Sequence, residues 1–332
     1  MIIFLFGYHT KGVFIMQKTQ FKGIIILFLT AFIWGSSFVS QSLGMETVEA
    51  FTFNGIRTLF GAATLLPFIV IKDLLKIKKQ GMPEKEKLKK DTKKLLLGGS
   101  VMGIALCIAS NLQQYAFSYP DHSPGKIAFI TAFYMFFVPI LGLLFRKKVP
   151  VITWLCVVLG TVGLYFLCVH GEGFGGITKS DIFSLLCSVF YAVHILVIEK
   201  FAADSDAVKL SFIQFTVSGV ITCIIMFIVE TPTISAINQS ILPLLYSGVM
   251  SCGLAYTFQI IGQKYTESTI ASIIMCLESV FGVLCSALML KKGLSPNEII
   301  GCVIMFAAII LSQFSDRIQE KFRSRKTDKN IV

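Results

Sequence analysis

Charged residues are scarce in this sequence. Only 15% of its 332 residues are Asp, Glu, Lys or Arg, whereas about a quarter of the residues in a soluble domain are charged. Hydrophobic residues make up 55% of the chain, and they come in long uninterrupted runs. The composition therefore excludes a soluble protein with one large core and indicates a polytopic membrane protein.

The short motifs of enzymes and metal sites are also missing. The sequence contains no C-x-x-C pair and no Cys/His cluster with the spacing of metal ligands, so we expect no metal and no cofactor. It lacks H-E-x-x-H, G-x-S-x-G and a Walker-type G-K-[ST] motif, which argues against an enzyme and against a chain driven by ATP. The nine cysteines all fall in apolar runs, where they are typical small packing residues.

Acidic residues are fewer than basic ones, which leaves a net charge of +11. In a soluble protein this excess would suggest a nucleic-acid partner. Here the Lys and Arg residues lie almost entirely between the apolar runs. They therefore indicate orientation in a membrane, and we expect no nucleic-acid partner.

The apolar runs divide into ten segments, each close to the roughly 20 residues that cross about 30 Å of hydrocarbon. The predicted spans are 23–42, 49–71, 95–117, 125–145, 150–169, 181–200, 209–230, 241–262, 268–290 and 295–314. Proline occurs inside two of them, at Pro67 and Pro139, which membrane helices tolerate where neighbouring groups satisfy the freed carbonyls. The predicted fold is an all-α integral membrane protein with ten transmembrane helices in a lipid bilayer.

The distribution of Lys and Arg between the spans predicts the orientation. With the N-terminus inside, the inner segments hold twenty-five Lys and Arg residues and the outer segments hold four. Since the cytoplasmic side carries the excess, we predict a multi-pass protein of the plasma membrane with both termini in the cytoplasm. Residues 72–94 form the largest basic segment and are expected to be a solvated cytoplasmic linker.

Three segments lie outside the predicted five-helix halves. Residues 1–22 are expected to be a cytoplasmic N-terminal segment, of which 1–15 is too short to span and is interpreted as an upstream extension from a misassigned start codon. Residues 170–180 form a Gly-rich linker at the midpoint, and 316–332 form a basic cytoplasmic tail.

The two halves, 23–169 and 181–315, match each other in register. Equivalent positions pair Trp34 with Tyr191, Gln113 with Gln259, and Tyr134 with Glu278. Because each half has an odd number of spans, the second must enter the membrane from the opposite side. The result is a 5+5 inverted repeat, an arrangement that places a binding site at mid-depth and supports alternating access.

Four motifs occur in order along the chain: Phe32-Ile-Trp-Gly-Ser-Ser-Phe38, Asn54-Gly-Ile-Arg57, Ser123-Pro-Gly-Lys126 with Thr131-Ala-Phe-Tyr134, and Leu277-Glu-Ser279. Together they resemble the drug/metabolite transporter superfamily, and specifically a pair of EamA-type repeats. The resemblance implies ten helices in an inverted repeat, with the third, fourth, eighth and ninth spans lining a central cavity. Such proteins move amino acids, nucleosides, sugars or drugs, often outward, so the resemblance names no single substrate.

The chain departs from the pattern of that family in two places. Ser279 replaces the proline of the Leu-Glu-Pro turn, which removes a residue that would kink the ninth helix. Lys291-Lys292 replaces the usual Gly-Glu at the end of that helix, so any role of that acidic end is absent here.

Glu278 is the strongest candidate for a functional residue because it lies in the middle of an apolar span. A carboxylate at that depth faces a bundle interior, a partner or water. It either binds a substrate ammonium or carries a coupling proton, or it is locked by hydrogen bonds to neighbouring helices. Arg57 is also at depth, where it either binds an anionic group, pairs with Glu278 as a gate, or ties one helix to backbone carbonyls.

Polar and small residues form one stripe on each of two predicted helices. The stripe of the third span contains Gly103, Cys107, Asn111 and Gln114, and that of the eighth contains Cys252, Tyr256, Gln259 and Gln263. These stripes either line a pocket or pack against other helices, and their repetition in both halves favours the pocket. The repeat favours Gln113 over Gln114 and the stripe favours the reverse, so both remain candidates.

Three other mid-span residues are candidates with structural alternatives. His194 is either a coupling group or a histidine hydrogen-bonded across helices. Trp34 and Tyr134 either stack on a ligand or pack in the core.

The predicted function is a secondary transporter of a small, amino-acid-like or drug-like metabolite, with export favoured and protons as a coupling ion. An intramembrane enzyme and a membrane scaffold or sensor are the alternatives, and the chain acts as a monomer or homodimer.

Overall fold

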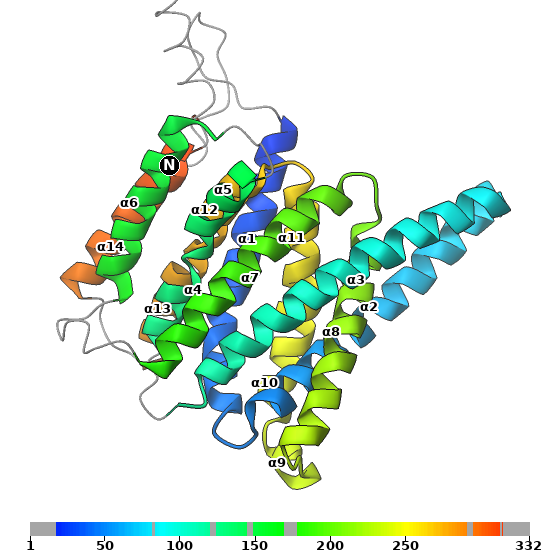
Figure 1. The fold of residues 1–332 in the computed structure, drawn as a ribbon, viewed down its shortest axis with the longest axis horizontal. Coiled ribbons are helices and arrows are strands. Elements are labelled where there is room, and N and C mark those ends of the chain that lie inside the picture. Colours follow the sequence, from blue (N-terminus) through cyan, green and yellow to red (C-terminus); the bar gives the residue numbers. More distant parts are fainter. Residues whose placement is uncertain are drawn as a thin grey trace, which may run out of the picture.

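The computed structural model describes residues 18–81, 84–119, 124–144, 149–168, 178–290, 295–312 and 314. All regular elements in these segments are helices (Figure 1). Eight of the helices are long and apolar enough to cross a membrane, and two shorter apolar helices cover Val151–Phe166 and Pro296–Ser312. The all-helical membrane fold is thus confirmed, with eight of the ten predicted spans reaching full length. The N-terminal extension, most of the linker and the basic tail lie outside the described residues.

The described residues of the first half form six helices. They are α1 (Lys18–Gly44), α2 (Ala50–Gln80), α3 (Lys85–Ala116), α4 (Pro124–Thr131), α5 (Tyr134–Leu144) and α6 (Val151–Cys168). The predicted fourth span is divided between α4 and α5, while α2 continues through Pro67 without a break.

Nine helical elements lie in the part of the second half that the structure describes. They are α7 (Lys179–Ala202), α8 (Ala207–Val229), α9 (Ile234–Gln239), α10 (Ile241–Tyr246), the π-helix η2 (Ser247–Ala255), α11 (Tyr256–Gln263), α12 (Ser268–Met275), α13 (Leu277–Leu290) and α14 (Pro296–Ser312). The predicted eighth span becomes α10, η2 and α11 in succession, and the ninth is divided between α12 and α13.

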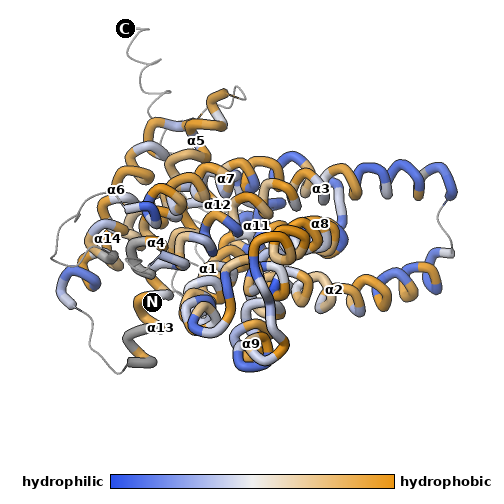
Figure 2. Tube along the Cα trace, turned by 60° about the horizontal axis from the view of Figure 1, so that its bottom comes forward, coloured by the Kyte–Doolittle hydropathy of each residue, from blue (hydrophilic) through white to orange (hydrophobic). Residues whose placement is uncertain are grey.

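Many large apolar side chains are exposed on the outside of the bundle, whereas many polar side chains are buried inside it. Most of the bundle helices are rich in hydrophobic residues along their length (Figure 2). Phe68, Phe227 and Ile228 are among the large exposed apolar residues, while Asn54 and Gln114 are fully buried. This inverts the pattern of a soluble protein. It is expected of a bundle whose surroundings are lipid and whose backbone groups must be satisfied within helices.

The packing of the helices is symmetric between the halves. The second helices of the two halves, α2 and α8, pack on each other, and so do the fifth helices, α6 and α14. The contact of α3 with α7 has its counterpart in the contact of α1 with η2 and α11. Likewise, α1 packs on α12 and α13 as α7 packs on α4 and α5. Exchanging the halves therefore reproduces the contacts, as a pseudo-two-fold axis requires.

The two halves run through the bundle in opposite directions. Glu230, which follows α8, accepts hydrogen bonds from the backbone N–H groups of Phe51 and Thr52 at the start of α2, at 2.8 and 2.6 Å. At the opposite ends, Lys72 of α2 contacts Asp206, which precedes α8. Equivalent helices α2 and α8 are thus antiparallel, which confirms the inverted arrangement that the odd number of spans predicts.

Two helix breaks meet at the centre of the bundle. One separates α4 from α5 at Ala132 and Phe133, and the other separates α12 from α13 at Cys276. The Sγ atom of Cys276 donates to the Ala132 carbonyl at 3.5 Å. The ninth span is therefore interrupted although Ser279 replaces the kinking proline. A tighter turn, in which the Ser279 N–H bonds to the Cys276 carbonyl at 3.1 Å, takes the place of the proline.

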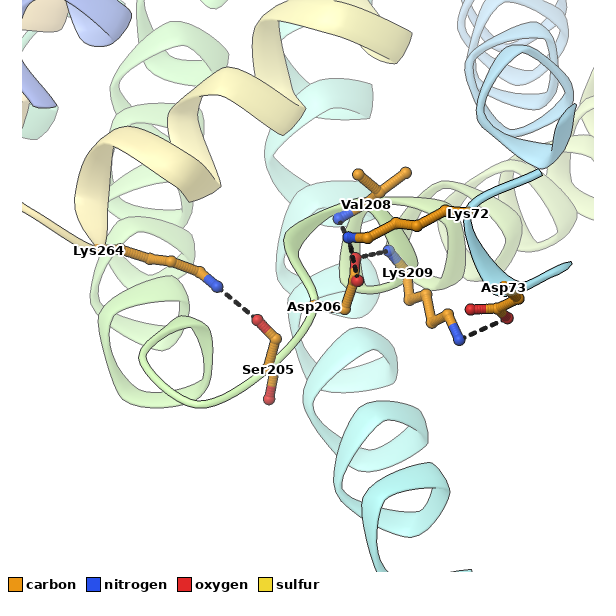
Figure 3. A network of polar contacts seen from close by, with 7 residues as sticks. All are labelled: Lys72, Asp73, Ser205, Asp206, Val208, Lys209 and Lys264. Atoms are coloured by element: carbon orange, nitrogen blue, oxygen red, sulfur yellow. Dashed lines mark hydrogen bonds and ion pairs between the residues drawn. The ribbon is translucent and has the colours of Figure 1, made fainter. Parts of the chain in front are cut away.

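Ion pairs join the halves at one end of the bundle (Figure 3). Lys72 Nζ lies 2.6 Å from an Asp206 carboxylate oxygen, and Lys209 Nζ lies 2.7 Å from Asp73. Each pair connects the end of α2 with the start of α8. These residues are partly exposed, so each pair contributes at most about 1 kcal/mol to stability, but together they fix where the two helices meet.

The loop between α7 and α8 completes this network. Lys264, just after α11, donates to the Ser205 carbonyl at 2.5 Å (Figure 3), and burial lowers the pKa of its ammonium group. Burial by itself would raise the pKa of Asp206, but the hydrogen bonds from Lys72 and from the backbone N–H groups of Lys209 and Val208 outweigh burial and lower the pKa. Asp206 is thus held ionised, and it caps the N-terminus of α8.

Candidate functional site

A cavity lies at the centre of the bundle, between the two halves, and its empty space, including its opening, is about 530 Å³. The lining residues are Trp34, Phe38, Gln41, Arg57, Gln113, Thr131, Tyr134, Tyr191, Ile195, Ser251, Tyr256, Gln259, Met275 and Glu278. The third, fourth, eighth and ninth spans all contribute, as the family resemblance implies. Helices α1, α2 and α7 contribute as well, which that expectation omitted.

The cavity lies on the pseudo-two-fold axis. Ten of its lining residues form five pairs at equivalent positions of the two repeats: Trp34 with Tyr191, Phe38 with Ile195, Gln113 with Gln259, Thr131 with Met275, and Tyr134 with Glu278. Each repeat therefore supplies one wall of the same space. A space of this kind is the part of an inverted-repeat protein that can be exposed to either side in turn.

Glu278 is the second residue of α13, which begins at Leu277 directly after the break at Cys276. Its side chain is 6% exposed, and its Oε1 accepts a hydrogen bond from the Tyr134 hydroxyl at 3.1 Å. The two residues occupy equivalent positions in the repeats. A phenol from one half thus donates to a carboxyl from the other half inside the cavity.

Arg57 lies on α2 and is 5% exposed. Its Nε donates to Asn54 Oδ1 at 2.9 Å, which is the one hydrogen bond of its guanidinium within the described residues. Its charged end also lies 5.6 Å from the centre of the Phe53 ring. One edge of the guanidinium is thus fixed by Asn54, while the side chain still lines the cavity.

A chain of hydrogen bonds leads from Arg57 to the other half. Asn54 Nδ2 donates to Asn111 Oδ1 at 2.7 Å and to Ser110 Oγ at 3.0 Å. Asn111 Nδ2 in turn donates to Thr222 Oγ1 of α8 at 2.8 Å. Asn111 therefore does not line the cavity. It supports Arg57 from behind and joins α2, α3 and α8.

Arg57 and Glu278 line the same cavity, but no ion pair joins these two described side chains. The ion pair that the sequence suggested as one alternative is thus not formed between these described residues. The guanidinium comes from the first repeat and the carboxyl from the second.

The two glutamines of α3 have different surroundings. Gln113 lines the cavity, accepts from the Tyr191 hydroxyl at 3.0 Å and donates to Thr131 Oγ1 at 3.4 Å. Gln114 is fully buried away from the cavity, and neither of its amide atoms has a hydrogen-bond partner in the described chain. The repeat alignment therefore located the cavity residue and the helical stripe did not.

The stripe on the third span faces a neighbouring helix. Asn111 and Cys107 both contact Thr222 of α8, so this stripe is interhelical packing. The stripe on the eighth span is divided: Tyr256 and Gln259 line the cavity, and the Gln259 Oε1 atom has no partner within the described residues. Small and polar residues on a membrane helix thus serve for packing between helices in one stripe and for lining the cavity in the other.

His194 lies outside the cavity lining. It is fully buried, and its Nε2 lies 3.0 Å from Gln214 Oε1 on α8, an arrangement in which Nε2 carries the hydrogen. Its ring contacts Tyr256, which also packs against Trp34 with the ring centres 4.6 Å apart. Trp34 and Tyr256 line the cavity directly, whereas His194 supports Tyr256 from behind.

Several residues that line the cavity were not among the candidates predicted from the sequence. Tyr191 could have been found as the repeat equivalent of Trp34, and Thr131 lies one turn from Tyr134. Gln41 and Ser251 have no signal of this kind because nothing marks which face of their helices points inward. The lining as a whole combines one guanidinium, one carboxyl, amides and aromatic rings, and no group of three or more metal-binding side chains occurs in the described part of the chain.

Comparison with known proteins agrees with this architecture. The EamA-like transporter family matches residues 21–169 and 178–314. An uncharacterized transporter of Archaeoglobus fulgidus is 28% identical over 309 residues, which cover 91% of each chain. An uncharacterized transporter of Buchnera aphidicola is 25% identical over 265 residues, which cover 76% of this chain and 81% of the relative.

A solved crystal structure shares the fold. It superposes with a TM-score of 0.69 at 15% identity, over 90% of this chain and 98% of its own. The family match extends over both repeats and is consistent with the drug/metabolite transporter superfamily that the motifs resemble. The chain belongs to the EamA-like transporter family and is a membrane transporter.

Proposed function

We propose that the chain carries a small, amino-acid-like metabolite across the plasma membrane by alternating access, with export as the favoured direction. The observation that carries the proposal is the central cavity, because it lies on the axis between two inverted halves and takes equivalent residues from each. Rocking the halves about such an axis would expose the same residues to one side and then to the other.

The charges on the cavity wall support an amino-acid-like substrate. The Arg57 guanidinium could bind a carboxylate, for which its planar fork is well suited, and Glu278 could bind an ammonium group. The two are not paired with each other in the described structure. Trp34, Tyr191 and Tyr256 would surround the remaining part of the substrate.

Glu278 is also the proposed site of proton coupling. Its carboxyl is buried, and its hydrogen bond comes from a neutral phenol and not from a cation. Protonation would then change the charge of the cavity by one unit at its centre.

We further propose that both termini lie in the cytoplasm, since the inner segments would hold most of the Lys and Arg residues.

Transport by purified protein in liposomes tests the proposal, after a comparison of metabolites in cells with and without the chain has identified the substrate. We expect Glu278→Gln to lower uptake by roughly tenfold or more, because a charged hydrogen-bonding group is lost, and to remove its pH dependence. The membrane-inserted amount should not change.

Asp204→Asn is the control, because Asp204 is an exposed carboxylate outside the cavity. It should retain the uptake and pH dependence of the unsubstituted protein. Full, pH-dependent uptake by Glu278→Gln would remove this residue from the mechanism, and absence of any uptake by the unsubstituted protein would contradict the transport proposal itself.

A further inference from the structure

Two helices extend well past the rest of the bundle. Helix α2 has 31 residues and α3 has 32, whereas about 20 residues cross the hydrocarbon core of a bilayer. The outer part of α2, residues 71–80, and the first part of α3, residues 85–94, project together from one end of the molecule (Figures 1 and 2). We call these two segments the lysine hairpin.

The lysine hairpin is strongly basic. Residues 72–94 contain ten lysines against four acidic residues. Lys76, Lys78 and Lys79 are exposed on α2, and Lys89, Lys90 and Lys93 are exposed on α3. None of these six has an ion-pair partner among the described residues. Their charge is available for an external anionic partner.

The hairpin also exposes large apolar side chains next to its lysines. Leu74 is 61% exposed, Leu75 is 54% exposed and Leu88 is 49% exposed. On α2, Leu74 and Lys78 are four residues apart, and so are Leu75 and Lys79, which places apolar and basic side chains next to each other on the helix surface. This combination is typical of helices at the level of lipid headgroups, where the apolar part enters the interface and lysines reach the phosphates.

Ion pairs fix the base of the hairpin to the bundle. Lys72 at the base of α2 contacts Asp206, and Lys94 at the base of α3 contacts Asp204 at 3.2 Å. Both partners belong to the α7–α8 loop of the second half. The hairpin therefore leaves the bundle in a set direction from the level at which α2 leaves the membrane.

We propose that the lysine hairpin binds the anionic phospholipid surface of the membrane that the protein spans. A membrane is favoured over a soluble acidic partner because the hairpin is continuous with two spanning helices, which keep it at the membrane surface at a high effective concentration. Attraction between lysines near a membrane and anionic headgroups is strong enough that each lysine strengthens the contact roughly fivefold.

Proteolysis in liposomes tests this contact without any substrate. Glu84 and Glu86 are exposed at the tip of the hairpin, so a glutamate-specific protease cuts there and its rate reports whether the tip is accessible. The full chain is reconstituted in phosphatidylcholine alone or with about a third phosphatidylglycerol. We expect cleavage at the tip to be at least about tenfold slower with phosphatidylglycerol, and this protection to disappear in 1 M NaCl, where the screening length falls to about 3 Å.

The double variant Lys76→Gln/Lys79→Gln should lose most of the protection, since two lysines account for roughly a 25-fold change. The matched control is Lys22→Gln/Lys200→Gln, which removes two exposed lysines from the same end of the bundle outside the hairpin and should behave as the unsubstituted chain. Equal cleavage rates in the two lipids, or equal loss of protection in both variants, would overturn the proposal. Protection by soluble heparin but not by phosphatidylglycerol would also overturn it, in favour of a soluble polyanionic partner.

Discussion

The hydrogen bond that the structure describes for Arg57 goes to a side chain, that of Asn54. Asn54 holds Nε, and Asn111 and Ser110 hold Asn54. The structural alternative considered for Arg57, a tie to backbone carbonyls, is therefore not what the described contacts show. The arginine is positioned by a neighbouring amide one turn earlier on the same helix.

A double-mutant cycle separates this arrangement from a charge gate. We expect Arg57→Ala and Asn54→Ala to be coupled in the free energy of unfolding by about 0.5–3 kcal/mol, because the two side chains share a hydrogen bond. Arg57→Ala and Glu278→Gln should be more weakly coupled than that pair, because both line the cavity but no hydrogen bond or ion pair joins them in this conformation. Unfolding in mixed micelles measures both cycles, and strong coupling only in the second would contradict the structure.

At this scale the sequence predicted residue types better than residue positions. Seven of the ten candidate residues line the cavity, namely Trp34, Arg57, Gln113, Tyr134, Tyr256, Gln259 and Glu278. Asn111, Gln114 and His194 do not. A polar residue in a span can be expected to be buried, but the rotation of its helix decides whether it meets the cavity or another helix. The comparison of the repeats gave the right rotation for Gln113, and the stripe of the eighth span gave it for Tyr256 and Gln259.

Among the helices, α1 and α13 make one of the closest crossings, at Gly35. A Cβ atom on Gly35 would lie 2.6 Å from the Glu278 carbonyl oxygen and 2.8 Å from the Gly282 nitrogen. Both are backbone atoms, which cannot move aside as a flexible side chain could. The position of the helix that carries Glu278 therefore depends on the absence of a side chain on α1.

Replacing each glycine at this crossing should have unequal effects. We expect Gly35→Ala to destabilise the protein by about 1–3 kcal/mol, as overpacking does, and to lower its melting temperature in detergent. Gly282→Ala is the control, because its Cβ would lie 3.6 Å from the Gly35 carbonyl oxygen, an ordinary contact. It should be neutral or slightly stabilising, since alanine favours a helix. Equal melting temperatures for the two variants would show that the crossing is not tight at Gly35.

The existence of the helices was predictable, but their interruptions were not. Long apolar runs mark the spans because lipid requires helices. The breaks at Ala132–Phe133 and Cys276, and the π-helix Ser247–Ala255, contain no proline within them. They depend on backbone hydrogen bonds and on packing at the centre of the bundle, and local sequence carries little information on either.

For the whole molecule, the inverted arrangement followed from counting spans, and the antiparallel contacts of α2 and α8 confirm it. The side of the membrane on which each end lies depends on the distribution of charge alone. The end of the bundle that carries the lysine hairpin is also the end at which Lys209 and Lys264 lie. This concentration of positive charge supports a cytoplasmic location for that end.

Reporter fusions determine the orientation directly. A green fluorescent protein fused after Gly81, between α2 and α3, should fluoresce because it stays in the cytoplasm. Alkaline phosphatase fused after Gln239, between α8 and α10, should be active because it reaches the outer side. Each reporter placed at the other site serves as the control and should be inactive, and the reverse pattern would place the lysine hairpin outside the cell.

Polar contacts join α2 and α8 at both ends of their interface. At one end the Glu230 carboxylate accepts hydrogen bonds from the first residues of α2, and at the other end two lysine–aspartate ion pairs connect the helices. Moving α2 away from α8 at one end would break the Glu230 hydrogen bonds, and moving them apart at the other end would break the ion pairs. Bending α4–α5 and α12–α13 at their central breaks would leave both sets of contacts in place. We therefore expect the contact between α2 and α8 to stay fixed, and α4–α5 and α12–α13 to bend at their breaks.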